Sequence, residues 1–210
     1  MKRFTIFLLL ALTVIQLEAA PVVGKIVQVD GVFEAQERGA KKRSLQLGSQ
    51  IMEGDTLTTS KNSTGKVEFF DGTSVLLVSD TSLFIDTYKK NRIFIKLYKG
   101  GSRFVTGSIP KNYPDNVEVN TPNVTIGFRG TTTVLAHLLG ISYVQGVDGT
   151  TVMKNKVSSG KVGPALAFQY STISSQMSRM QLGTSPSPSL MKLFTPGARA
   201  SKKDGLCWKE

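Results

Sequence analysis

The chain has 210 residues, a single cysteine, a single histidine and a formal net charge of +11 at pH 7. One cysteine excludes an intramolecular disulfide, so Cys207, beside Trp208, can only stay free or pair with another molecule. One histidine and one cysteine are too few for the usual zinc site, and no metal or other cofactor is expected. The positive charge favours anionic partners such as lipid head groups, acidic polysaccharides or wall polymers.

Residues 1–19 have the three-part layout of a secretory signal peptide. Met1, Lys2 and Arg3 form a short, positively charged start, residues 4–17 are almost wholly apolar, and Ala19 offers a small residue for cleavage. An uncleaved membrane anchor is the competing interpretation, but about 14 apolar residues are fewer than the roughly 20 that span a bilayer. We therefore expect an exported protein without a transmembrane anchor after cleavage. The periplasm is favoured over the cell surface or the medium.

The mature chain is predicted to be all-β, either a sandwich or a compact solenoid-like stack of short strands. Apolar or alternating runs recur about every 8 to 12 residues with turn residues between them, which is typical of these classes. Residues 66–69 alternate polar and apolar side chains, and Asp71-Gly72 marks a hairpin turn. Further strands are expected at residues 22–29, 75–78, 83–85, 93–97, 104–105, 117–119, 124–128, 134–139, 141–144, 147–153 and 165–173.

Glycines set several of the expected strand ends. Gly100-Gly101 is predicted to end the strand at 93–97, and Gly140 to end the strand at 134–139. Asp148-Gly149 is predicted to turn a hairpin between residues 141–144 and 147–153. A strand is favoured over a helical turn at 134–139 because three threonines precede it. Residues 174–181 are compatible with a short helix, but the pattern is too brief to decide.

Composition divides the chain into four parts. After the signal peptide, residues 20–50 are expected to form an N-terminal β hairpin and a charged loop, and residues 51–175 a β domain. Residues 176–210 are predicted to be a flexible basic tail, because few apolar side chains there can offset the entropy of ordering. Two small apolar islands in it, 190–194 and 206–208, could dock on the body or on a partner.

Five short motifs follow one another between residues 51 and 135. They are a Gly-Asp-Thr step at 53–59, an Asp-Gly-Thr turn within 67–74, an apolar run and Ser/Leu turn at 75–85, a strand ending in glycine at 93–100, and Thr121-Pro122-Asn123 with Arg129-Gly130-Thr131. In this order and spacing they resemble the FecR domain. The resemblance implies an extracytoplasmic β module of bacterial envelopes, associated with signalling and binding rather than catalysis. Regulation of a sigma factor is not expected, because only three residues precede the apolar segment.

Arg129 is the residue within these motifs that most invites a functional role. Its guanidinium could reach backbone carbonyls or a carboxylate such as Asp71 or Asp55, which would make it a buried or half-buried strut. A ligand contact is the less favoured alternative, since no second recognition residue accompanies it.

Residues that would carry catalysis are few. His137 lies in an apolar run and is interpreted as a packed neutral imidazole, since a general base also needs a partner and a cleft. No serine lies in Gly-x-Ser-x-Gly, and no phosphate-binding glycine loop occurs. We therefore expect no enzyme and assign no catalytic, cofactor-binding or metal-binding residue. The sequence does not identify the binding residues or the oligomeric state.

Two non-catalytic functions follow from these observations. The first is a binding or scaffolding module of the cell envelope with a protein or glycan partner. The second is a secreted or surface-associated factor that attaches to an anionic polymer or partner through its basic tail, and deletion of residues 184–210 would distinguish the two. Nucleic-acid binding is not expected. Phe69, Phe84, Phe94 and Tyr98 could stack on bases, but alternating aromatic residues in strands are more often core, and charge alone gives only non-specific attraction.

Overall fold

The structure is a computed structural model that describes residues 20–166, 168–185 and 194. The predicted signal peptide, the apolar island at 206–208 and Cys207 lie outside these residues, and the side chain of Arg129 is also not described. No helix within the described residues is long and apolar enough to cross a membrane.

Strands dominate the described chain, which confirms the all-β prediction. They are β1 (Val22–Asp30), β2 (Phe33–Glu37), β3 (Arg43–Ser44), β4 (Gln50–Met52), β5 (Asp55–Thr59), β6 (Thr64–Phe69), β7 (Ser74–Leu77), β8 (Ser82–Lys89), β9 (Arg92–Val105), β10 (Val117–Asn120), β11 (Thr125–Leu138), β12 (Ile141–Lys154), β13 (Ser159–Val162), β14 (Tyr170–Ile173) and β15 (Gln181–Gly183).

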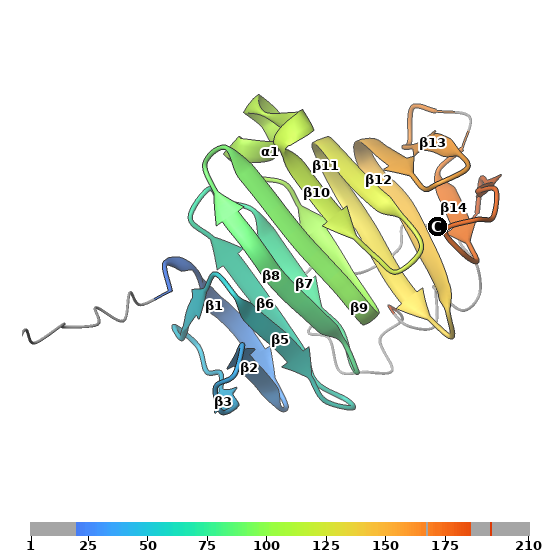
Figure 1. The fold of residues 1–210 in the computed structure, drawn as a ribbon. Helices are drawn as coiled ribbons and strands as arrows, with labels where there is room; N and C mark the ends of the chain where they lie inside the picture. The colour runs from blue at the N-terminus through green and yellow to red at the C-terminus, as the bar shows by residue number, and fades with distance from the viewer. Residues whose placement is uncertain (1–19, 167, 186–193, 195–210) are drawn as a thin grey trace, which may run out of the picture.

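The strand pairings form two runs that share three long strands. The first, which we call the β1 sheet, runs β4-β1-β6-β7-β9-β11-β12-β14-β15. The second, the β8 sheet, runs β3-β2-β5-β8-β9-β10-β11-β12-β13. Strands β9, β11 and β12 each pair in one sheet with one half and in the other sheet with the other half. Figure 1 shows the stack running from β1–β3 at one end to β13 and β14 at the other.

Glycines bend these long strands instead of ending them, so two of the predicted strand ends were wrong. Strand β9 continues through Gly100, which has φ +85° and would bring an added Cβ to 2.4 Å from Oγ1 of Thr81. Strand β12 continues through Gly149, at φ +66°, where the predicted hairpin turn does not exist. Gly140 does end its strand, and the β11–β12 hairpin turns there. A glycine within a strand often marks a bend or a close backbone approach, which is its role here.

The remaining differences are local. The strand expected at 165–173 is confined to β14, residues 174–181 contain no helix, and β15 lies beyond the expected end of the body. Helix α1 (Ser108–Asn112) and the 3-10 helix η1 (Pro114–Asn116) were not predicted. They lie in the connection from β9 to β10, which pair in parallel and therefore need a crossover.

The main core lies between the two sheets. Ile26 and Val67 face it from the β1 sheet, and Leu57 and Ile95 from the β8 sheet, each at most 1 % exposed. A second cluster covers the opposite face of the β1 sheet, because side chains alternate along β11 and Leu135 faces the main core. Its buried members are Val78, Val134, Ala136, Tyr143, Tyr170 and Phe194. Phe194, from the predicted apolar island at 190–194, is thus docked on the body.

Candidate functional site

Asp55, in the first motif, is held by the chain itself. Its carboxylate is fully buried and accepts hydrogen bonds from both terminal nitrogens of Arg43, at 2.8 and 2.5 Å, and from the backbone N–H of Met52 at 2.8 Å. The bond to this carboxylate raises the pKa of Arg43. The side chain of Asp55 therefore closes the start of β5 against β3 and β4, and no face of it is left for a ligand.

Asp71, in the Asp-Gly turn, organises a second internal network. Its Oδ1 accepts from the backbone N–H of Thr73 and from the hydroxyl of Tyr88, and its Oδ2 accepts from the hydroxyl of Thr73 and the N–H of Ile109, at 2.8 to 3.2 Å. Burial raises the pKa of Tyr88 far above its usual range, so the phenol stays protonated and donates. This carboxylate fixes the β6–β7 hairpin to β8 and to the start of α1.

The Thr-Pro-Asn motif joins segments that are distant in the sequence. Thr121 Oγ1 lies 2.7 Å from Oγ of Ser142, and Nδ2 of Asn123 donates to the carbonyls of Gly140 and Ile173 at 2.7 and 3.0 Å. The motif therefore holds the β11–β12 hairpin and the end of β14 together. Its buried polar groups, like those of Asp55 and Asp71, bond to the backbone and side chains of the protein itself.

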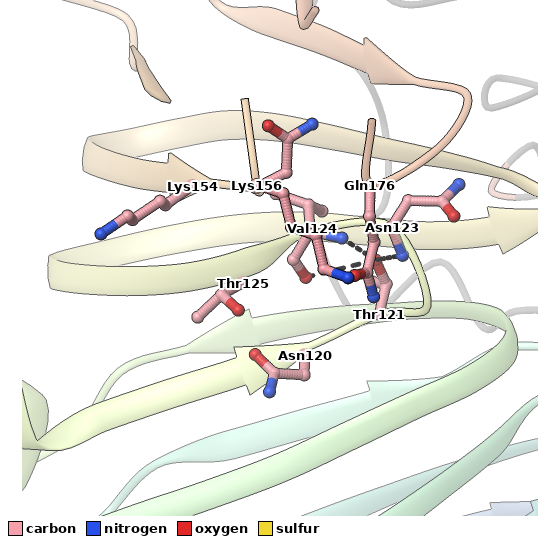
Figure 2. Close-up of a pocket in the computed structure, with 9 residues that line it drawn as sticks. Asn120, Thr121, Asn123, Val124, Thr125, Lys154, Lys156 and Gln176 are labelled. Atoms are coloured by element: carbon pink, nitrogen blue, oxygen red, sulfur yellow. Dashed lines mark hydrogen bonds between the residues drawn. The ribbon is translucent and has the colours of Figure 1, made fainter. Parts of the chain in front are cut away.

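A polar hollow of about 350 Å³ lies over the Thr-Pro-Asn turn (Figure 2). Gln176 closes one side of the hollow. Its side-chain Nε2 donates to the carbonyl of Pro122 at 2.8 Å, and its backbone carbonyl accepts from the backbone N–H of Lys156. Lys154 and Lys156 are exposed at its rim, and Lys154 projects away from Gln176 in Figure 2. The lining residues are Asn120, Thr121, Asn123, Val124, Thr125, Lys154, Asn155, Lys156 and Gln176.

One amide in this hollow has an unused acceptor. Oδ1 of Asn120 is buried without a hydrogen-bond partner among the described residues. This atom is closed off from solvent, and an unmet buried acceptor costs about 1–3 kcal/mol. Sequence analysis did not single out this residue or the lysines. The polar triplet 154–156, directly after the apolar residues Val152 and Met153, was the available signal.

Three aromatic residues lie outside the core, on the outer face of the β8 sheet. Of the four aromatic residues considered for stacking, only Phe69 is in the core. Phe84 and Phe94 are half-buried and Tyr98 is 47 % exposed, and the rings of Phe84 and Tyr98 stack with centroids 6.3 Å apart. The expectation that such residues form the core was wrong for these three. We call Phe84, Phe94 and Tyr98 the aromatic platform.

Cations lie against the platform. Nζ of Lys96 is 4.9 Å from the ring centroid of Phe94 and 5.6 Å from that of Phe84, and the guanidinium of Arg92 is 5.9 Å from the ring of Phe94. These distances are within the range of cation–π attraction. Lys96 also forms an ion pair with Asp86 at 2.5 Å. The platform is therefore held rigid by contacts within the β8–β9 hairpin.

His137 is half-buried on β11, with Nδ1 3.0 Å from Oγ of Ser142. Burial lowers the pKa of His137, in agreement with the predicted neutral imidazole. Ser142 is fully buried and shares a hydrogen bond with Thr121, so a substrate could not reach its hydroxyl. Among the described residues, no group of three or more His, Cys, Asp or Glu side chains is placed to hold a metal ion.

Comparison with known proteins identifies the family. Residues 55–162, more than half of the chain, match the sequence profile of the FecR protein family. The chain therefore belongs to the FecR family, and the resemblance seen in its motifs is confirmed. Among curated proteins, none matches the chain in sequence.

Two crystal structures of a proposed anti-sigma factor from Parabacteroides distasonis have a similar fold. The first, at 1.65 Å resolution, has a TM-score of 0.51 and 12 % sequence identity, and the second, at 2.50 Å, has a TM-score of 0.50 and the same identity. Each comparison covers 60 % of this chain and 58 % of the other. At this identity the likeness concerns the fold alone.

Proposed function

We propose that this FecR-family chain is a non-catalytic binding module of the bacterial cell envelope, and that it binds its partner at the polar hollow and the adjoining outer face of the β8 sheet. The observation that carries the proposal is the division of polar groups. The motif side chains of Asp55, Asp71 and Asn123 bond to the chain itself, whereas Lys154 and Lys156 are exposed beside the hollow.

The candidate catalytic side chains are poorly accessible to a substrate, which disfavours a catalytic role. His137 is the one histidine, and the serine that it contacts is fully buried. A general base needs a reachable proton to abstract, and a nucleophile must meet the substrate. The envelope location rests on the predicted signal peptide at residues 1–19.

Charge supports binding at the rim of the hollow. Lys154 and Lys156 take part in none of the ion pairs found among the described residues, whereas Lys42, Lys89 and Lys96 each have a carboxylate partner. Unpaired cations beside a polar hollow attract an anionic partner and set its position.

Capture from envelope extracts tests the proposal. The immobilised mature chain, residues 20–210, is compared with K154Q/K156Q and with K25Q/K61Q, which removes the same charge from two exposed lysines on β1 and in the turn before β6. A discrete envelope component should be retained at about 150 mM salt and lost in K154Q/K156Q alone. Equal loss in both variants would mean that general charge does the binding.

The same assay examines attachment through the tail. K202Q/K203Q removes two tail charges and leaves the docked Phe194 in place. If this variant loses the component while K154Q/K156Q retains it, the tail and not the hollow holds the partner, and the proposed site is wrong.

A further inference from the structure

Along one row of paired residues on the outer face of the β8 sheet, the side chains change in chemical character from one end to the other. Phe84 pairs with Lys96, which pairs with Asn120, which pairs with Thr125, which pairs with Lys154. Four strand spacings of about 4.8 Å make this row about 19 Å long. The aromatic platform is at one end of the row and the hollow with its lysines at the other.

The two ends differ in net charge. At the platform, Asp86 neutralises Lys96, the cation that contacts the rings of both Phe84 and Phe94, and Arg92 lies near the ring of Phe94 alone. At the other end, Lys154, Lys156 and Lys161 are exposed and belong to none of the ion pairs among the described residues. An occupant of the whole row therefore needs an apolar, ring-shaped surface at one end and negative charge at the other.

The middle of the row presents polar groups of both kinds. Thr125 is half-exposed, and the carboxylate of Glu118 is exposed opposite Phe94. An exposed carboxylate and a hydroxyl accept hydrogen bonds, so they suit an occupant rich in hydroxyl donors.

We propose that this row binds an acidic polysaccharide, with a sugar ring packed on Tyr98 and Phe84 and with carboxylate or phosphate substituents near Lys154 and Lys156. The proposal rests on the function proposed above and names its ligand class. Sugar rings offer C–H faces that pack on aromatic rings, and their hydroxyls can donate to Thr125 and Glu118.

A single-stranded nucleic acid fits the row less well. Channels for single strands combine stacking rings with a positively charged groove that follows the whole backbone. Here Glu118, on β10, interrupts that path between the rings and the lysines. The phosphates of a single strand are part of its backbone and must pass this point, whereas a sugar unit can turn a hydroxyl toward it and its charged substituent away.

Affinity electrophoresis of the mature chain tests the assignment with three probes: polygalacturonate as an acidic polysaccharide, dextran as a neutral one, and a thymidine oligonucleotide. Tyr98→Ser removes the exposed ring of the platform, and Tyr113→Ser removes a matched ring that is 48 % exposed in the α1–η1 link. K154Q/K156Q and K25Q/K61Q form the matched charge pair. Thermal melts confirm that each variant is folded.

Polygalacturonate should bind more tightly than dextran at equal monomer concentration, and more tightly than the oligonucleotide at equal charge concentration. Tyr98→Ser should weaken it about fivefold or more, the loss typical of an interface aromatic residue, while Tyr113→Ser leaves it unchanged. K154Q/K156Q should weaken it and flatten its salt dependence more than K25Q/K61Q does.

Three results would overturn the inference: equal effects of Tyr98→Ser and Tyr113→Ser, oligonucleotide binding as tight as polygalacturonate binding, or binding of dextran as tight as that of the acidic polymer. If no polysaccharide binds but an envelope component is still captured through Lys154 and Lys156, the inference fails and the proposed function stands. If neither binds, both fail.

Discussion

Replacing Arg43 by methionine should be among the most destabilising single changes at a charged residue of this protein. The substitution keeps an unbranched apolar stem and removes both guanidinium donors from Asp55. The carboxylate is fully buried and would keep only the N–H of Met52 at 2.8 Å. Removing one partner of a buried ion pair leaves an uncompensated charge and costs about 3–5 kcal/mol.

The reverse change should cost less, and this asymmetry is the specific content of the prediction. Asp55→Asn leaves the side chain of Arg43 34 % exposed, so water can solvate its charge. Asp55→Asn should lower the free energy of unfolding by about 1–3 kcal/mol, because some hydrogen bonds to Arg43 become weaker or are not formed. In the double variant R43M/D55L the buried charge is absent, and most of the loss caused by R43M should be recovered.

Urea unfolding followed by far-ultraviolet circular dichroism measures these differences, because this signal reports on the strands and does not depend on the single tryptophan, Trp208, which is not among the described residues. For a domain of this size the R43M change corresponds to a fall in Tm of roughly 6–20 °C. The control is Lys42→Met, which breaks the exposed pair between Lys42 and Glu34 at 3.3 Å and should cost under about 1 kcal/mol. If R43M costs no more than K42M, the buried-charge argument is wrong.

Four further predictions concern other parts of the fold. Asn123→Asp replaces the donor of two backbone carbonyls by an acceptor and should cost at least about 2 kcal/mol in urea unfolding, with Asn123→Ala costing less. Phe194→Ala should uncover the second cluster, lower stability by about 1.5–3 kcal/mol and increase the binding of a hydrophobic dye. Gly149→Ala, at positive φ with an added Cβ 2.5 Å from a carbonyl oxygen, should cost more than Gly72→Ala, which has positive φ but open space around it. Because burial lowers the pKa of His137, the unfolded chain takes up its proton first; stability should be constant above about pH 6.5 and fall below it, and His137→Gln should flatten this decline.

The alternation of polar and apolar residues predicted where strands lie, but it did not predict that the long strands continue through glycines. The run at residues 66–69 became part of β6 because one of its faces is wet and the other buried, which leaves a period-2 signal in the sequence. Gly100 and Gly149 were interpreted as ending or turning strands, whereas in the structure they lie within strands and bend them. A glycine at the end of a strand and a glycine that bends a strand from one sheet to the next have the same local pattern, and only the pairing partners distinguish them.

The sequence also contained a signal that the platform faces solvent, although the number of aromatic residues there suggested a core. Along β9, aromatic residues and cations alternate with Ile93, Ile95 and Leu97, so both faces contain large apolar groups. Lys96 lies between Phe94 and Tyr98 on one of them. A buried lysine without a buried partner is rare, so the position of Lys96 indicates that this face is exposed to solvent. Contacts such as that of Asn123 with the carbonyl of Ile173, fifty residues away, left no comparable local signal.

The internal use of the family motifs explains why they identify the fold and not the ligand. Asp55, Asp71 and Asn123 hold strand ends, a hairpin and the β14 segment in place, and each of these tasks requires its polar atoms to bond within the chain. A side chain used in this way cannot also select a partner. Under the proposed function, selectivity would come from outward residues such as Tyr98 and Lys154, because a fold alone does not fix what is bound.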